Sequence, residues 1–83
     1  MIRLKLRYTT AYDWFGGSAR TDNVNEAIAR VYNREIRQAG SPRCHVALRE
    51  KIADGTYIVQ MGHACNDRAT CLDSRMVVHI DSN

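Results

Sequence analysis

The sequence predicts an α+β fold, with one helix packed on one face of a mainly antiparallel four-stranded sheet in the order β-α-β-β-β. Polar and apolar residues alternate at the start of the chain and again after residue 43, which is typical of strands with one buried face. Between these regions, apolar residues recur at helical spacing. Because domains rarely divide below roughly 100 residues, we expect residues 1–83 to form a single domain.

The first strand is expected over residues 2–8. Apolar side chains occupy the even positions from Ile2 to Tyr8, and the odd positions carry Arg3, Lys5 and Arg7. One face is therefore expected to be buried and the other to be cationic, which discourages edge-to-edge pairing with another strand.

A long loop is expected over residues 11–22, because a glycine pair followed by serine is typical of an irregular connection. Three aromatic residues come just before this glycine pair: Tyr12, Trp14 and Phe15. They favour two interpretations. Either the loop presents them to a partner, or Trp14 and Phe15 fold under the loop and cap one end of the sheet.

The helix is expected over residues 23–39. Asn23 and Glu26 have the spacing of an N-terminal capping pair, and Gly40 followed by Pro42 favours a C-terminal stop. The apolar face consists of Val24, Ala27, Ile28, Val31 and Tyr32. Glu35 projects near the centre of this face. We expect its carboxylate to reach solvent or an arginine from a frayed last turn; the alternative is a partly buried acid with a raised pKa.

Asp54-Gly55 predicts a two-residue hairpin turn between strands at residues 44–53 and 56–65. With that turn, residues whose numbers sum to 109 are expected to pair, which places Leu48 opposite Met61 and Cys44 opposite Cys65. Glu50 interrupts the resulting apolar face, and a bulge there is an alternative to unbroken pairing. A three-residue loop would instead put Cys65 on the other face from Cys44. The last strand, RMVVHI, is expected to turn Met76, Val78 and Ile80 inward. We expect Leu4, Ile28, Leu48 and Val78 to meet in one interior.

The predicted hairpin gathers four residues that zinc sites use, namely Cys44, His63, Cys65 and Cys71. A zinc-stabilised domain is thus one alternative, and a Cys44–Cys65 disulfide is another. Paired C-x₂₋₄-C motifs are missing, however, and a helix on four strands does not need a metal to fold. We therefore favour free thiols that act as small hydrophobes, and we predict neither a metal nor another cofactor.

Catalysis is not indicated by any pattern in the sequence. Cys44 and His45 are sequential in a strand and point to opposite faces, so they cannot act as a nucleophile and its base. The chain has no phosphate loop, dinucleotide fingerprint or H-E-x-x-H motif. Residues 1–15 lack the apolar core of a secretory signal, and no apolar run approaches the roughly 18 residues of a membrane span. We expect a cytoplasmic, non-enzymatic protein that does not associate with membranes.

Positive charge is concentrated in residues 1–51, which hold ten Lys and Arg against five Asp and Glu. Two basic groups are expected. The outer faces of two strands carry Arg3, Lys5, Arg7, Arg49 and Lys51, which would share one surface if those strands were neighbours. The helix carries Arg30, Arg34 and Arg37. Either group suits phosphate or carboxylate partners, because arginine binds both through two parallel hydrogen bonds.

These features favour a non-catalytic interaction module that binds a protein partner through Tyr12, Trp14, Phe15, Arg30, Arg34 and Arg37. Self-association into a homodimer through an exposed strand edge is also expected. The alternative is a nucleic-acid-binding domain that uses Arg3, Lys5, Arg7, Arg49 and Lys51. In its size and its lack of catalytic motifs, the chain resembles small accessory proteins of phages and mobile elements. That resemblance implies a protein that occupies a surface of a larger assembly.

Overall fold

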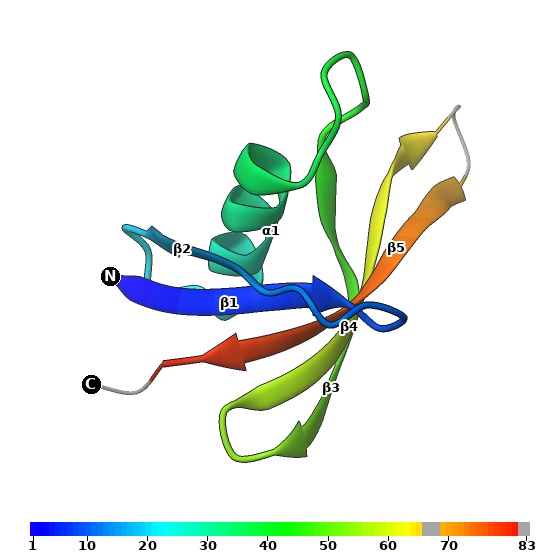
Figure 1. Cartoon of the computed structure of the whole chain (residues 1–83). Helices are drawn as coiled ribbons and strands as arrows, with labels where there is room; N and C mark the ends of the chain where they lie inside the picture. The colour runs from blue at the N-terminus through cyan, green and yellow to red at the C-terminus, as the bar shows by residue number, and fades with distance from the viewer. Residues whose placement is uncertain (66–68, 82–83) are drawn as a thin grey trace.

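The computed structural model describes residues 1–65 and 69–81, which form one antiparallel sheet and one helix packed against it (Figure 1). The elements are β1 (Ile2–Tyr8), β2 (Phe15–Ala19), α1 (Val24–Glu35), β3 (Cys44–Ala53), β4 (Thr56–Cys65) and β5 (Ala69–Ile80). The strands are arranged in the order β2-β1-β5-β4-β3, so the first and last strands in sequence lie side by side, and the start of β1 and the end of β5 lie at the same end of the sheet (Figure 1). The predicted fold class is confirmed.

β2 is a strand that the sequence does not predict, since it lies in the segment expected to be a loop. It pairs with β1 from Phe15 opposite Leu6 to Ala19 opposite Ile2. Glycine is a poor strand former, but at Gly17 the missing side chain lets the helix approach closely. A Cβ there would lie 3.0 Å from the Cγ1 atom of Val31 on α1. Helix packing therefore explains why position 17 of this strand is a glycine.

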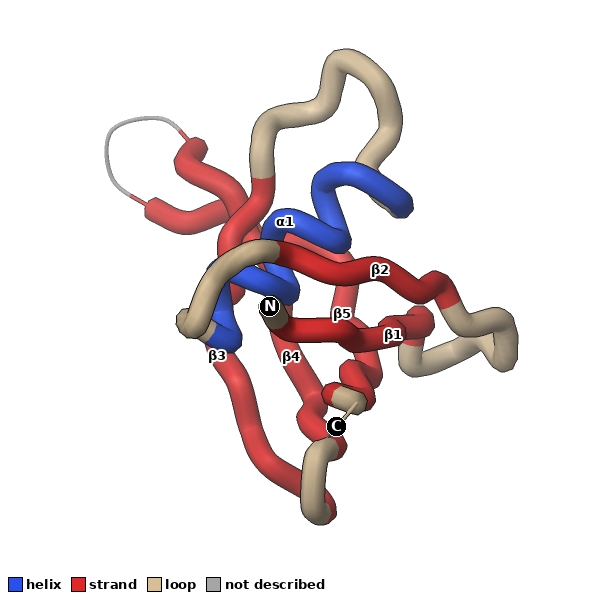
Figure 2. The backbone as a smooth tube through the Cα atoms, turned by 90° about the vertical axis from the view of Figure 1, so that its left-hand side faces the viewer, coloured by secondary structure: helices blue, strands red, loops and turns tan. Residues whose placement is uncertain are grey.

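The helix begins as predicted and ends earlier than residue 39. The side chain of Asn23 accepts a hydrogen bond from the backbone nitrogen of Glu26 at 3.0 Å, which caps the N-terminus. α1 stops at Glu35, and the chain continues through a projecting loop to β3 (Figure 2). The Glu35 carboxylate is exposed and lies 3.3 Å from the Nε atom of Arg34. The expected pairing with an arginine in the last turn is confirmed.

A single core fills the space between α1 and the sheet. Its largest fully buried side chains are Leu4, Leu6, Ile28, Val31, Val59, Met61, Met76 and Val78. Leu4, Ile28 and Val78 meet in this interior as predicted. The prediction for Leu48 is wrong, because this side chain is 67% exposed.

Two β-bulges in β3 explain the position of Leu48. The turn itself is as predicted, since Ala53 pairs with Thr56 across Asp54-Gly55. Each bulge then inserts an unpaired residue into β3 and shifts the register. Leu48 consequently stands opposite Gln60 instead of Met61, and Cys44 stands opposite His63 instead of Cys65. The predicted register is wrong beyond the turn. Glu50 interrupts the alternation and points to a bulge, but the bulges lie at Ala47 and Ile52, and the sequence pattern does not locate them.

Asn33 fixes the start of β3 to the helix. Its Nδ2 atom donates to the carbonyl oxygens of Ala29 and Cys44 at 2.8 Å each, and its Oδ1 atom accepts from the Cys44 backbone nitrogen at 2.8 Å. The amide thus pairs with Cys44 much as a neighbouring strand would. This contact sets the position of Cys44 relative to α1.

Replacing Asn33 with alanine is expected to lower the free energy of unfolding by about 1–3 kcal/mol, because backbone groups of Cys44 would lose their partners. Urea denaturation followed by far-UV circular dichroism measures the change. Asn25→Ala on the exposed side of α1 is the matched control, with an expected change below about 0.5 kcal/mol. Equal effects of the two substitutions would show that the Asn33 contacts contribute nothing specific.

Candidate docking face and cysteine–histidine cluster

The side of the sheet that faces away from α1 is called the open face below, and no helix among residues 1–65 and 69–81 covers it. Leu4 and Leu6 are buried beneath the helix, so the residues between and beside them on β1 point the other way. Residues that pair across neighbouring strands lie on the same side of the sheet. Arg7 pairs with Val77 on β5, which pairs with Ile58 on β4, so all three belong to the open face. Its other members include Arg3, Lys5, Leu48, Glu50, Thr56, Gln60, Arg75 and His79.

Trp14 lies over the open face beside two cations. The Lys5 Nζ atom is 4.8 Å and the Arg7 Cζ atom 5.1 Å from the centre of its ring. Arg7 also donates to the carbonyl oxygen of Ala11 at 2.9 Å, which ties the loop to β1. Trp14 remains 41% exposed, so the loop presents it to solvent instead of burying it under the sheet. Tyr12 is 94% exposed, and Phe15, which belongs to β2, is 36% exposed.

Two adjoining hollows on the open face share Ile58. The first lies beside Trp14 and is lined by Lys5, Arg7, Trp14, Ile52, Thr56, Ile58, Val77 and His79. The second extends toward the other end of the sheet and is lined by Ala47, Leu48, Glu50, Ile58, Gln60, Leu72 and Arg75. Ile52 is 54% exposed, and Leu48 and Leu72 are each 67% exposed. Aliphatic side chains are thus accessible on the same face as the tryptophan and its cations.

The expected surface of five cations does not form. β5 and β4 separate β1 from β3, so the two strands are not neighbours. Arg49 pairs with the buried Val59 and Lys51 pairs with Tyr57, which places both cations on the helix side of the sheet. There the Arg49 guanidinium lies 5.1 Å from the Tyr57 ring. The bulges in β3 are the physical reason, because they reverse the expected faces.

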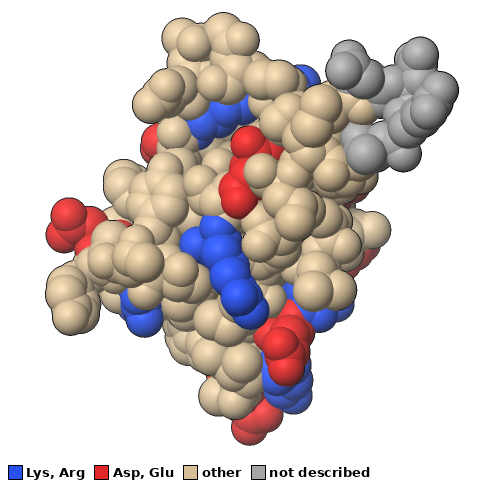
Figure 3. Space-filling view, turned by 90° about the vertical axis from the view of Figure 1, so that its right-hand side faces the viewer, with Lys and Arg blue, Asp and Glu red and all other residues tan. Residues whose placement is uncertain are grey.

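The three helix arginines form ion pairs or hydrogen bonds with other groups of the same chain. Arg30 forms an ion pair with Glu26 at 2.5 Å, Arg34 donates to the Ser18 carbonyl oxygen at 2.7 Å, and Arg37 donates to that of Ser41. They hold the helix, β2 and the following loop together and do not form an unpaired stripe. On the face drawn in Figure 3, basic and acidic atoms form small separate groups between larger uncharged areas.

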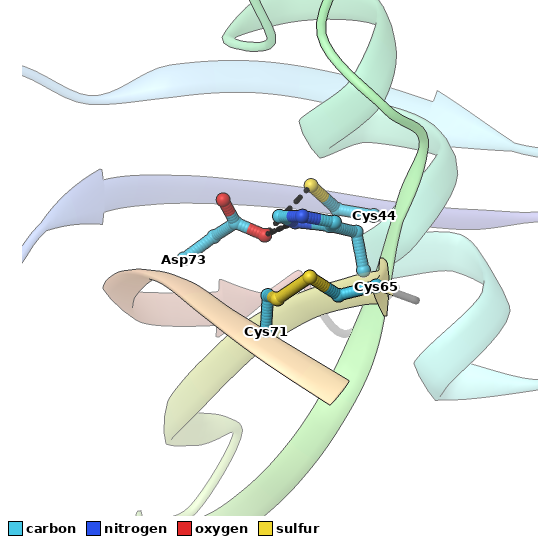
Figure 4. Close-up of a disulfide and its surroundings, with 5 residues drawn as sticks. Cys44, Cys65, Cys71 and Asp73 are labelled. Atoms are coloured by element: carbon cyan, nitrogen blue, oxygen red, sulfur yellow. Dashed lines mark hydrogen bonds and ion pairs between the residues drawn. A yellow bond between two sulfur atoms is a disulfide. The ribbon is translucent and has the colours of Figure 1, made fainter. Parts of the chain in front are cut away.

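The cysteines and His63 lie on the helix side, where β3, β4 and β5 diverge from the rest of the sheet. Cys65 and Cys71 form a disulfide with their Cα atoms 5.4 Å apart, and Cys44 is a buried free thiol (Figure 4). The expectation of free thiols is therefore wrong for Cys65 and Cys71, and the alternative Cys44–Cys65 disulfide is wrong as well. β5 begins at Ala69, before the strand RMVVHI that the sequence predicts, and this brings Cys71 opposite His63.

Asp73 is the member of this cluster that sequence reasoning misses. Its Oδ2 atom lies 2.5 Å from the Nδ1 atom of His63 and accepts a hydrogen bond from the Cys44 thiol at 3.4 Å (Figure 4). Alternate residues of a strand share a face, so the spacing Cys71-x-Asp73 places both side chains on one side of the sheet. This could be inferred only once β5 is known to include both residues.

Cys44 does not have the environment of a nucleophile. Burial, reinforced by the hydrogen bond to Asp73, raises the pKa of its thiol to about 11. At neutral pH the thiol is therefore protonated, whereas catalysis requires the thiolate. The order of contacts also differs from that of a catalytic triad, because Asp73 stands between Cys44 and His63.

No protein-family model matches the chain, and no curated protein or solved structure matches it. No helix in the described parts of the chain is long and apolar enough to cross a membrane. The class that can be stated is a small α+β domain with a five-stranded antiparallel sheet and one helix.

Proposed function

We propose that this protein is a non-catalytic binding module whose open face docks an acidic segment of a partner protein. The observation that carries the proposal is the exposure of Leu48, Ile52 and Leu72 on the face that also presents Trp14. Exposed apolar patches mark interaction sites, and tryptophan is enriched among the residues that contribute most to protein–protein binding. A cytoplasmic location and a phage or mobile-element origin remain predictions.

Charge supports an acidic partner. The open face carries the four cations Arg3, Lys5, Arg7 and Arg75 against the carboxylates of Glu50 and of Asp81, which continues the register of β5 beside Arg3. Complementary charge speeds association and favours one partner over another. A partner segment that placed carboxylates against the cations of β1 and apolar side chains against Leu48 and Leu72 would complement both the charged and the apolar part of the open face.

Nucleic-acid binding is the second candidate, and the position of Trp14 favours it. An aromatic ring beside Lys5 and Arg7 is an arrangement on which a base could stack next to a phosphate. The exposed leucines argue for a protein, since they offer nothing to a phosphate backbone. Mobility shifts with random single-stranded DNA and RNA separate the two candidates. We expect no shift at about 50 mM salt, and a shift that weakens as salt rises would support the second candidate.

Homodimer formation stays a prediction, and the two sheet edges differ in their suitability for it. β2 is short and is held by Arg34 of the helix, while β3 is longer but is interrupted by two bulges. Bulges and charges at an edge discourage regular pairing with another strand. Light scattering after size-exclusion chromatography gives the mass in solution directly.

The docking proposal is tested with three immobilised baits incubated with the same cell lysate. They are the wild type, the double variant Trp14→Ala/Leu48→Ser, and Arg49→Ala as the control. Arg49 is an exposed β3 residue on the opposite face, so its loss should leave docking unchanged.

We expect the double variant to lose the partners that both other baits retain. With a purified partner, Trp14→Ala alone is expected to weaken binding by at least about tenfold, measured by calorimetry. Far-UV circular dichroism checks that each bait is folded. Identical partner lists for the wild type and the double variant would refute docking through the open face.

A further inference from the structure

His63 belongs to two groups of potential metal ligands on the helix side of the sheet. One group joins it with Cys65 and Cys71, the other with Cys44 and Asp73, and in each group the donor atoms all lie within 4.8 Å of one another. The register explains why they converge, since His63 stands opposite Cys44 on β3 and opposite Cys71 on β5. Figure 4 draws the disulfide below Asp73 and Cys44, in the same part of the sheet.

We propose that His63, Cys65 and Cys71 bind a zinc ion when the disulfide between the two cysteines is reduced. Thiolate and imidazole are the donors that zinc prefers in proteins, and three protein ligands leave a fourth position for water. The Cα atoms of the two cysteines are 5.4 Å apart. At this separation both sulfurs can reach one ion through bonds of about 2.3 Å.

Asp73 prepares His63 for this role. The Asp73 carboxylate lies 2.5 Å from Nδ1 of the imidazole, and a carboxylate partner makes Nδ1 the hydrogen-bond donor. The lone pair of Nε2 is then available to a metal. A carboxylate behind a histidine is the usual second contact in zinc sites, where it fixes the tautomer and the ring orientation. Asp73 is therefore a positioning residue.

Cys44 is assigned no ligand role, although it belongs to the second group. Its side chain is buried, and its Sγ atom is already a hydrogen-bond donor to Asp73. The thiols of Cys65 and Cys71 become available together, because one chemical event releases both. Zinc binding by His63, Cys65 and Cys71 therefore depends on reduction of the disulfide, whereas the group with Cys44 and Asp73 has no such dependence.

The chemistry balances with a cellular dithiol as the reductant. Two thiol–disulfide exchanges transfer two electrons and two protons to the Cys65–Cys71 bond, which becomes two thiols, while the dithiol closes to its own disulfide. Zinc binding then displaces the two thiol protons to the buffer. In the test, a phosphine replaces the dithiol so that the reductant does not chelate the metal, and it takes up oxygen from water to form a phosphine oxide.

The experiment compares oxidised and phosphine-reduced protein by equilibrium dialysis against zinc and by titration with cobalt. We expect one zinc per reduced chain and none bound to oxidised chain at the same concentrations. Cobalt is expected to give the near-ultraviolet band of a thiolate–metal bond. His63→Ala should weaken binding at least tenfold, and Asp73→Asn roughly 10–100-fold. His45→Ala, an exposed histidine in β3, is the control, and its affinity should be unchanged.

Two results would overturn the site. Equal zinc binding by oxidised and reduced protein would assign the metal to other groups, and so would full affinity in the double variant Cys65→Ser/Cys71→Ser. That variant also reports whether the fold persists without the disulfide, which far-UV circular dichroism measures. Absence of zinc binding by reduced, folded wild type would refute the proposal directly.

Discussion

Replacing Leu6 with alanine is expected to lower the free energy of unfolding by about 2–5 kcal/mol. The side chain is fully buried in β1, between the helix and the neighbouring strands, so its removal leaves a cavity as well as lost apolar burial. A domain of 83 residues has a total stability of roughly 4–12 kcal/mol, and the loss is therefore a large share of the total. Urea denaturation followed by far-UV circular dichroism measures it.

Leu48→Ala is the matched control, because it removes the same atoms from a strand of the same sheet. Leu48 is 67% exposed, so we expect a change in stability below about 0.5 kcal/mol. Comparable losses from the two substitutions would mean that Leu48 is in the core, as simple alternation along β3 predicts, and that the bulged register is wrong. If docking occurs on the open face, Leu48→Ala should also weaken partner binding without affecting the fold.

The same contrast shows what the sequence can and cannot predict about the fold. Alternation in β1 places Leu4 and Leu6 correctly, since an unbroken strand keeps a period of two along its length. The capping pair of Asn23 and Glu26 is equally local and is also correct. Glu50 points to a bulge in β3, but the position of each bulge depends on the partner strand, so the local pattern assigns Leu48 and later residues to the wrong face.

The candidate sites depend even more on contacts between distant segments. The tryptophan could be singled out from the sequence, but its place beside Lys5 depends on how the loop folds back over β1. Ile52 is expected on the apolar face of the hairpin, and the bulges in β3 make it a surface residue. Leu72 precedes the predicted last strand and reaches the open face because β5 begins earlier than expected. Asp73 joins His63 because β4 and β5 pair beyond the predicted strand, a contact that no spacing along the chain encodes.

Gly62→Ala is expected to destabilise the protein by about 1–3 kcal/mol, because overpacking in a closely packed region forces neighbouring atoms to move. An added Cβ would lie 2.6 Å from the Cγ2 atom of Thr70 and 3.1 Å from the carbonyl oxygen of Cys71. Gly16→Ala is the control, because a Cβ there meets only the Leu4 carbonyl oxygen at 4.0 Å. Urea denaturation of both variants gives the comparison.

A second substitution tests the proposed cause of this loss. Thr70→Ser removes the Cγ2 atom that the new side chain would strike, so it should restore part of the stability in a Gly62→Ala background. Thr70 is exposed, and Thr70→Ser alone is expected to change stability by less than about 0.5 kcal/mol. If the double variant is more stable than Gly62→Ala alone, the two substitutions are energetically coupled, and residues 62 and 70 are in contact across β4 and β5. If Gly62→Ala were harmless, these strands would not pair closely beside His63 and Cys71, and the metal-ligand cluster would lose the register that brings it together.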